Sequence, residues 1–72
     1  MAALLPVELF THREKRVARY LLFGKSRSEI AALMCLSEHT IKTHTQNILK
    51  KAEVKNQKEF MVKYLLEHSD VY

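Results

Sequence analysis

Hydrophobic residues recur every three or four positions along most of the chain, and polar residues suited to capping helices interrupt this repeat. In the first such segment Val17 and Leu21 fall on one helical face, and Gly24 then ends the repeat. The spacing is typical of amphipathic α-helices, because a half-buried β-strand would alternate at every second residue. The pattern predicts four helices, near residues 12–23, 27–34, 38–51 and 57–68.

Four polar residues predict where these helices begin. Thr11 and Ser26 are each followed three positions later by Glu, the capping-box spacing in which hydroxyl and carboxylate bind each other's backbone amides. Ser37 and Asn56 are also residue types that cap helices. The turn between the second and third helices is very short, so these two helices must cross at a steep angle, as in a helix-turn-helix unit.

Length and composition favour one small all-α domain. The chain has 72 residues, too few for two separate cores or for a deep enzyme cleft. It contains one Gly and one Pro, which leaves little material for the tight turns of a β-sandwich. We interpret residues 1–8 as a linker or flexible arm and residues 9–72 as a four-helix domain.

The third predicted helix has a polar side that suits DNA. Pointing Ile41, Thr45 and Ile48 toward the core turns the opposite side outward. That outward side carries His39, Lys42, Thr43, Gln46 and Lys50. Lys and Gln can bind base edges, and Thr can offer its hydroxyl or its methyl group. A polar helix side is more often simply solvated, so this face alone does not decide the function.

The charge balance agrees with a nucleic-acid partner. Twelve Lys and Arg stand against eight Asp and Glu, which gives a formal charge of +4 and a pI near 9.4. At the start of the third helix, the hydroxyls of Ser37 and Thr40 can donate to a phosphate that the helix dipole also attracts. The same residues also serve as ordinary caps, and both roles can hold together.

Several ordered motifs carry a resemblance to a known family. They read Phe10-Thr11-x-Arg13-Glu14-x-x-Val17, Gly24-Lys25-Ser26-x-x-Glu29-Ile30-Ala31, Leu36-Ser37-Glu38-x-Thr40-Ile41-Lys42-x-His44 and Asn47-Ile48-Leu49-x-Lys51. Together they resemble the LuxR-type (GerE-type) helix-turn-helix, over roughly Leu9 to Tyr64. Several motifs in the right order make this resemblance far more specific than a single match.

The resemblance implies a DNA-binding domain of bacterial transcription regulators, with the third helix in the major groove of double-stranded DNA. By position it implies base or groove contacts from Lys42, Thr43 and Gln46, and the outward side of the third helix adds His39 as a further candidate. It implies DNA backbone contacts from Ser26, Ser37, Thr40, Lys50 and Lys51. For His44 the residues leave two readings open, a core histidine and a DNA contact.

The chain departs from the family pattern at four positions. Cys35 stands in the turn where Gly or a small polar residue is usual, and Glu53 stands where Gly commonly closes the third helix in left-handed geometry. Ala52 replaces a usual Leu, and Gln57 replaces a usual Arg. We expect two strained turns, a thinner core beside the fourth helix, and one fewer charge contact.

The fourth predicted helix carries more apolar surface than one small core requires. The residues assigned to a homodimer interface are Met61, Val62, Leu65 and Leu66. The alternative is a helical protein-docking module, resembling the sigma-factor region that engages RNA polymerase, with this helix as its working surface. The discriminating feature is the polar side of the third helix, whose residues would be freely replaceable in a pure docking module.

The sequence offers no arrangement that supports catalysis or metal binding. His39 and His44 are five residues apart and fall on different sides of a helix, and no nucleophile has an oriented base. We therefore expect no enzyme activity, no metal, no cofactor and no small-molecule ligand within this domain. The single cysteine excludes an intrachain disulfide, and no apolar run reaches the ~18 residues of a membrane span. We expect a bacterial cytoplasmic protein.

Overall fold

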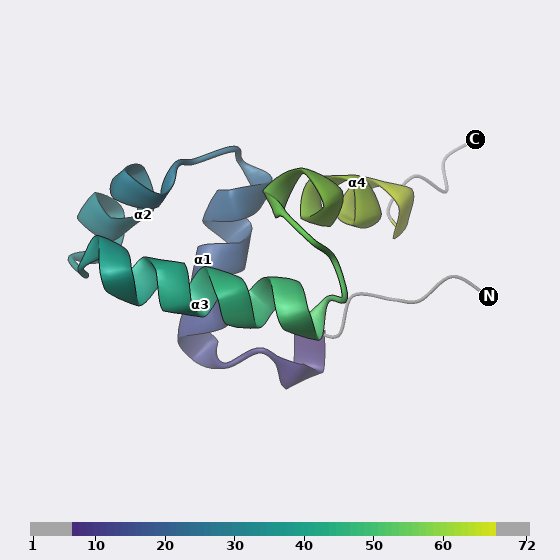
Figure 1. Cartoon of the computed structure of the whole chain (residues 1–72), viewed down its shortest axis with the longest axis horizontal. Helices are drawn as coiled ribbons and strands as arrows, with labels where there is room; N and C mark the ends of the chain where they lie inside the picture. Colours follow the sequence, from purple (N-terminus) through teal and green to yellow (C-terminus); the bar gives the residue numbers. More distant parts are fainter. Residues whose placement is uncertain (1–6, 68–72) are drawn as a thin grey trace.

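The computed structural model describes residues 7–67, which form one short 3-10 turn and four α-helices (Figure 1). The elements are η1 (Val7–Leu9), α1 (His12–Leu22), α2 (Arg27–Met34), α3 (Glu38–Lys51) and α4 (Gln57–Glu67). The described residues contain no strand, so the all-helical class with four helices is confirmed. The first helix ends one residue earlier than expected, and residue 68 of the fourth lies outside the described residues. Residues 1–6 of the expected arm also lie outside them, while its last two residues belong to η1.

The helices begin at the caps that the sequence predicts. Thr11 Oγ1 accepts from the Glu14 amide at 3.1 Å, and Glu14 Oε1 accepts from the Thr11 amide at 2.9 Å. Ser26 and Glu29 form the same reciprocal pair. Ser26 Oγ accepts from the Glu29 amide at 3.2 Å, and Glu29 Oε1 accepts from the Ser26 amide at 2.8 Å. Asn56 Oδ1 accepts from the amide three residues further on at 2.9 Å. Each cap satisfies an amide that the helix itself leaves without a partner.

Helices α1, α2 and α3 end in the same left-handed turn, built on three different residues. Gly24, Cys35 and Glu53 have φ values of 79°, 56° and 59°. In each turn the amide that follows the left-handed residue donates to the carbonyl five positions earlier: Lys25 to Tyr20 at 3.1 Å, Leu36 to Ala31 at 3.0 Å and Val54 to Leu49 at 3.0 Å. The expected strain at Cys35 and Glu53 is thus real, because a side chain disfavours this conformation by roughly 1–2 kcal/mol.

Replacing Glu53 by Gly is expected to stabilise the domain by about 0.5–1 kcal/mol, because Gly adopts a positive φ without a Cβ clash. Thermal unfolding should shift upward by a few degrees for a chain of this size. Lys58→Gly is the control, since Lys58 is exposed within the right-handed α4. It should lower stability by about 1 kcal/mol. Equal changes in stability for Glu53→Gly and Lys58→Gly would contradict the conclusion that Glu53 is strained by its positive φ.

The core lies where α1 packs against both α3 and α4, and where α2 packs against α3 (Figure 1). The buried side chains come from the segment before α1 and from all four helices. They are Phe10, Val17, Ala18, Leu21, Ile30, Ala31, Ile41, Ile48, Ala52 and Phe60. Phe60 is the only buried residue of α4, so its ring is the main apolar anchor of this helix in the core, with Tyr64 packed partly against the same core.

Candidate nucleic-acid interface

Helix α3 is held with one defined side inward. Ile41, Ile48 and Ala52, which caps its end, have no exposed surface, and Thr45 on the same side is half-buried. This is the orientation that the sequence pattern predicts, and it is fixed by packing of α3 against α1 and α2. The opposite side of α3 faces solvent along its whole length. Ala52 completes this inner side although a larger residue is usual there.

The exposed side of α3 carries the five residues that the sequence placed there. His39, Lys42, Thr43, Gln46 and Lys50 are all exposed. Lys42 and Gln46 are four residues apart and therefore lie side by side on the helix surface. Thr43 Oγ1 donates to the His39 carbonyl at 3.2 Å, so this hydroxyl can only accept a hydrogen bond from another group. The methyl group of Thr43 is the other part of this side chain that can contact a base. The arrangement provides hydrogen-bond donors and one methyl group for base edges in a groove.

The start of α3 adds hydroxyl groups beside the helix amides. Ser37 Oγ accepts from the Thr40 amide at 3.0 Å and donates to Thr40 Oγ1 at 2.9 Å. This pattern leaves the Thr40 hydroxyl proton able to donate elsewhere. Ser26 caps α2 in a similar way and lies 3.3 Å from the Ser28 hydroxyl. The capping role of Ser26 and Ser37 is therefore established, and an exposed cap can still bind a phosphate.

Lys51 occupies a different place from the one the sequence suggested. Its ammonium donates to Glu14 Oε1 at 2.6 Å and to the Leu9 carbonyl at 2.8 Å. The charge is therefore paired within the domain, across 37 residues of sequence, and it joins the end of α3 to the start of α1. Lys50, its neighbour, is exposed and is the better placed of the two lysines to meet a phosphate.

The Glu14 carboxylate is the one buried charged group among the described residues. Burial opposes its ionisation, but the hydrogen bonds from Lys51 and Thr11 and the charges of Lys51 and His44 outweigh burial. The pKa of Glu14 is consequently lowered from its ordinary value of 4.5. His44 is half-buried, and its charge contributes to this lowering of the Glu14 pKa.

Gln57 performs a role that the sequence did not reveal. Its Nε2 donates to the Leu21 carbonyl at 2.9 Å and to the Lys25 carbonyl at 3.4 Å. These carbonyls belong to the end of α1 and the turn after it, so Gln57 ties the start of α4 to α1. A neutral amide therefore serves as the link between the two helices at this position.

Other kinds of site find little support in residues 7–67. No group of three or more His, Cys, Asp or Glu side chains there lies close enough to hold a metal ion. No helix in this described part combines the length and the apolar character needed to cross a membrane. Cys35 is exposed, in the turn between α2 and α3.

Comparison with known proteins decides the family. The family model for bacterial regulatory proteins of the luxR family, GerE, matches residues 8–64. The chain belongs to the luxR family. This luxR-family domain is therefore a helix-turn-helix DNA-binding domain of bacterial transcription regulators, as the sequence motifs predicted, and the family is not enzymatic.

Similar proteins include regulators from several bacteria. The luxR-family domain is 50% identical over 48 residues to the probable csgAB operon transcriptional regulatory protein of Salmonella typhimurium, covering 67% of this chain and 22% of that protein. It is 48% identical over 59 residues to the uncharacterized transcriptional regulatory protein YhcZ of Bacillus subtilis, covering 78% and 28%. It is 34% identical over 62 residues to the response regulator protein VraR of Staphylococcus aureus, covering 86% and 29%. The chain thus spans about a quarter of the length of these curated relatives.

Proposed function

We propose that this domain regulates transcription by binding specific sequences in double-stranded DNA, with α3 in the major groove. The observation that carries the proposal is the exposed side of α3, which presents polar and cationic side chains while the opposite side is buried. The base or groove contacts are assigned to His39, Lys42, Thr43 and Gln46. Glu38 is the only acidic residue of α3, and it lies in the first turn, away from the middle of the reading side.

The proposed phosphate contacts flank that reading side. They come from Ser26, Ser37, Thr40 and Lys50, which lie at the starts of α2 and α3 and at the end of α3. Lys51 is also proposed to contact the DNA backbone, with its ammonium paired to Glu14 in the structure. Contacts of this kind fix the register of the protein on DNA, while the groove contacts select the sequence.

Sequence reading is tested by selecting binding sites from a randomised duplex pool and repeating the selection with a Lys42→Ala/Gln46→Ala variant. Selection should enrich a defined motif, and the double variant should lose about tenfold in preference for that motif over random DNA. Lys50→Ala should weaken binding to all DNA sequences alike, because it removes a phosphate contact. It should also reduce the salt slope, which is the slope of log binding constant against log salt concentration, by about one.

The control for this selection is Lys15→Ala, an exposed lysine of α1 that is not among the proposed contacts. It should leave both the motif and the salt slope unchanged. Unselective binding that is indifferent to the double variant would contradict sequence reading by α3.

We further propose that the domain binds DNA as a homodimer through the outer side of α4. Val62 and Leu66 are four residues apart there, 47% and 72% exposed, and they line a hollow of about 430 Å³. Lys58 and Glu59 line the same hollow, so a two-fold copy of this side can pair unlike charges around an apolar centre. Of the other residues assigned to the dimer, Met61 is half-buried and Leu65 is exposed, and both line a different groove, against α1.

Leu66→Glu is expected to shift sedimentation toward the monomer and to weaken binding to a two-half-site duplex at least tenfold, because a charge enters the centre of the apolar contact. Leu33→Glu makes the same change on α2, where Leu33 is 52% exposed, and should leave the sedimentation unchanged. An unchanged mass and DNA affinity for Leu66→Glu would exclude the dimer. Together with a loss of transcription, that result would support contact of α4 with RNA polymerase instead.

A further inference from the structure

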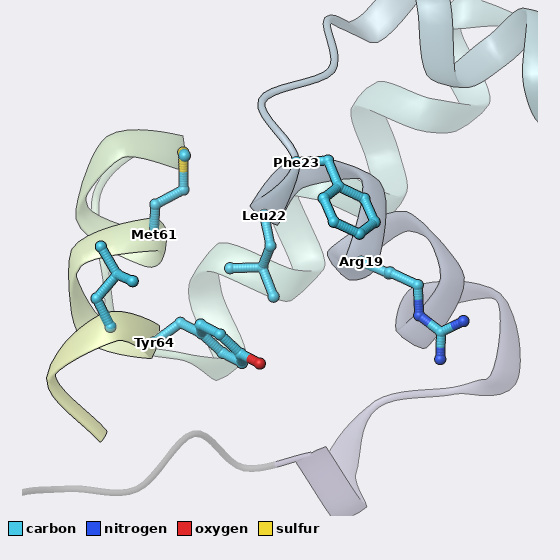
Figure 2. Close-up of a pocket in the computed structure, with 6 residues that line it drawn as sticks. Arg19, Leu22, Phe23, Met61 and Tyr64 are labelled. Carbon is cyan, nitrogen blue, oxygen red and sulfur yellow. The ribbon is translucent and has the colours of Figure 1, made fainter. Parts of the chain in front are cut away.

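A second apolar surface lies between the end of α1 and α4, apart from both the DNA-reading side and the Val62–Leu66 pair. It is a groove of about 330 Å³ lined by Arg19, Leu22, Phe23, Met61, Tyr64 and Leu65 (Figure 2). Figure 2 shows Leu22 between the two helices, facing the side chains of Met61 and Tyr64. Neither the DNA contacts nor the dimer contact accounts for a groove at this place.

The rim of the groove is unusually exposed for apolar residues. Phe23 is 72% exposed and Leu65 is 62% exposed, while Leu22 and Met61 at the floor are half-buried. An exposed aromatic ring beside half-buried aliphatic side chains is the arrangement into which an amphipathic helix places its apolar residues. The groove lies open at the surface, so it suits side chains on a protein rather than an enclosed small molecule.

The one charged residue that lines the groove is a cation. Arg19 stands at the edge, and Figure 2 shows its guanidinium on the side of α1 away from α4. Lys15 and Arg16, also exposed, lie one turn earlier on α1, at the positions that neighbour Arg19 on a helix. The six lining residues include no carboxylate. An occupant of the apolar groove therefore meets a row of cations along one edge.

This charge row selects among the possible occupants. A second copy of the chain, with a net charge of +4, would bring cations against cations if the same groove were shared across a two-fold axis. An acidic segment would gain on both counts, by burying apolar side chains and by placing carboxylates beside Lys15, Arg16 and Arg19.

We propose that the α1–α4 groove is a docking site for an acidic amphipathic helix of another protein. Apolar residues of that helix fill the space between Leu22, Phe23 and Met61, and its carboxylates lie along the cationic edge of α1. Val62 and Leu66 lie about 100° further around α4 than Met61 and Leu65. The groove is thus accessible while the outer side of α4 holds a second copy. The proposal does not depend on which DNA sequence α3 reads.

The test uses three synthetic helical peptides of equal length and the 72-residue chain. The first has Leu at i, i+4 and i+7 with Glu on the flanks, the second replaces Glu by Lys, and the third replaces Leu by Ser. In NMR titrations the first peptide should change the amide chemical shifts of Leu22, Phe23 and Leu65. The second and third should bind at least tenfold more weakly, and added salt should weaken the first.

Charge-reversal variants make the assignment specific. Arg19→Glu should weaken the acidic peptide at least fivefold and strengthen the lysine peptide, whereas Arg13→Glu should change either affinity less than twofold. Arg13 is also exposed, but it lies roughly 120° around α1 from Arg19. Phe23→Ser should weaken the acidic peptide while leaving DNA binding intact.

Three results would overturn the proposal. They are shifts confined to α3, an affinity that does not respond to the sign of the peptide charge, and a failure of the acidic peptide to bind at all. An Arg19→Glu variant that loses as much DNA affinity as Lys50→Ala would instead assign the cationic edge of α1 to DNA phosphates.

Discussion

Truncating Phe60 to Ala is expected to remove about 3–5 kcal/mol from the free energy of unfolding, the largest loss we expect from any single apolar substitution here. The ring is 1% exposed and is the only buried side chain of α4. A chain of 72 residues has a total stability of about 4–11 kcal/mol, so the loss is a large share of it. Urea unfolding followed by circular dichroism measures the change.

Phe23→Ala is the matched control, because it deletes the same ring from a position that is 72% exposed. It should change stability by less than about 0.5 kcal/mol. Since α4 is held to the core by Phe60, the Phe60→Ala variant should also lose amide protection in α4 before the other helices. Similar losses for the two Phe variants would contradict the role of the buried Phe60 ring in holding α4 to the core.

Replacing Lys51 by Met is expected to cost roughly 2–3 kcal/mol at neutral pH. The change keeps an apolar stem but removes the ammonium from the buried Glu14 carboxylate and from the Leu9 carbonyl. Removing one partner of a buried pair is typically more costly, but Lys51 itself is 31% exposed, and solvent screens part of the interaction. Chemical unfolding at pH 7 measures the loss.

The same pair makes stability depend on acid pH. The pKa of Glu14 is lowered in the folded chain, so its contribution is complete above the ordinary value of 4.5 and is lost as pH falls through the folded pKa. The difference between the parent and Lys51→Met should therefore shrink below about pH 4.5. Lys50→Met, at an exposed neighbour, should cost less than about 1 kcal/mol. A Lys51→Met deficit that persisted unchanged at pH 3 would rule out the ion pair as its cause.

Local sequence patterns predicted the helices and the orientation of α3 because both depend on nearby residues. The caps at Thr11 and Ser26 involve partners only three positions away. Burial of Ile41 and Ile48 follows from helical spacing alone. Once the buried side of α3 is known, the opposite, polar side must face solvent, so its exposure could also be predicted.

The links between distant segments could not be predicted in the same way. Lys51 meets Glu14 across 37 residues and Gln57 meets the Leu21 carbonyl across 36, distances at which the sequence contains no periodic pattern. The capping box alone explains a Glu at position 14, so the sequence gives no reason to expect Lys51 as a second partner of this carboxylate. Met61 was assigned to the dimer interface, and only the packing of α4 on α1 shows that it lines the groove between these two helices.

The ammonium of Lys51 links the start of the domain to the end of α3. It binds the carbonyl of Leu9, the last residue of η1, in the same place as the Glu14 carboxylate. The segment that enters the domain and the last turn of α3 therefore share one anchor. The Lys51 ammonium therefore ties the chain ahead of α1 to the last turn of α3, in addition to the apolar contact made by the buried ring of Phe10.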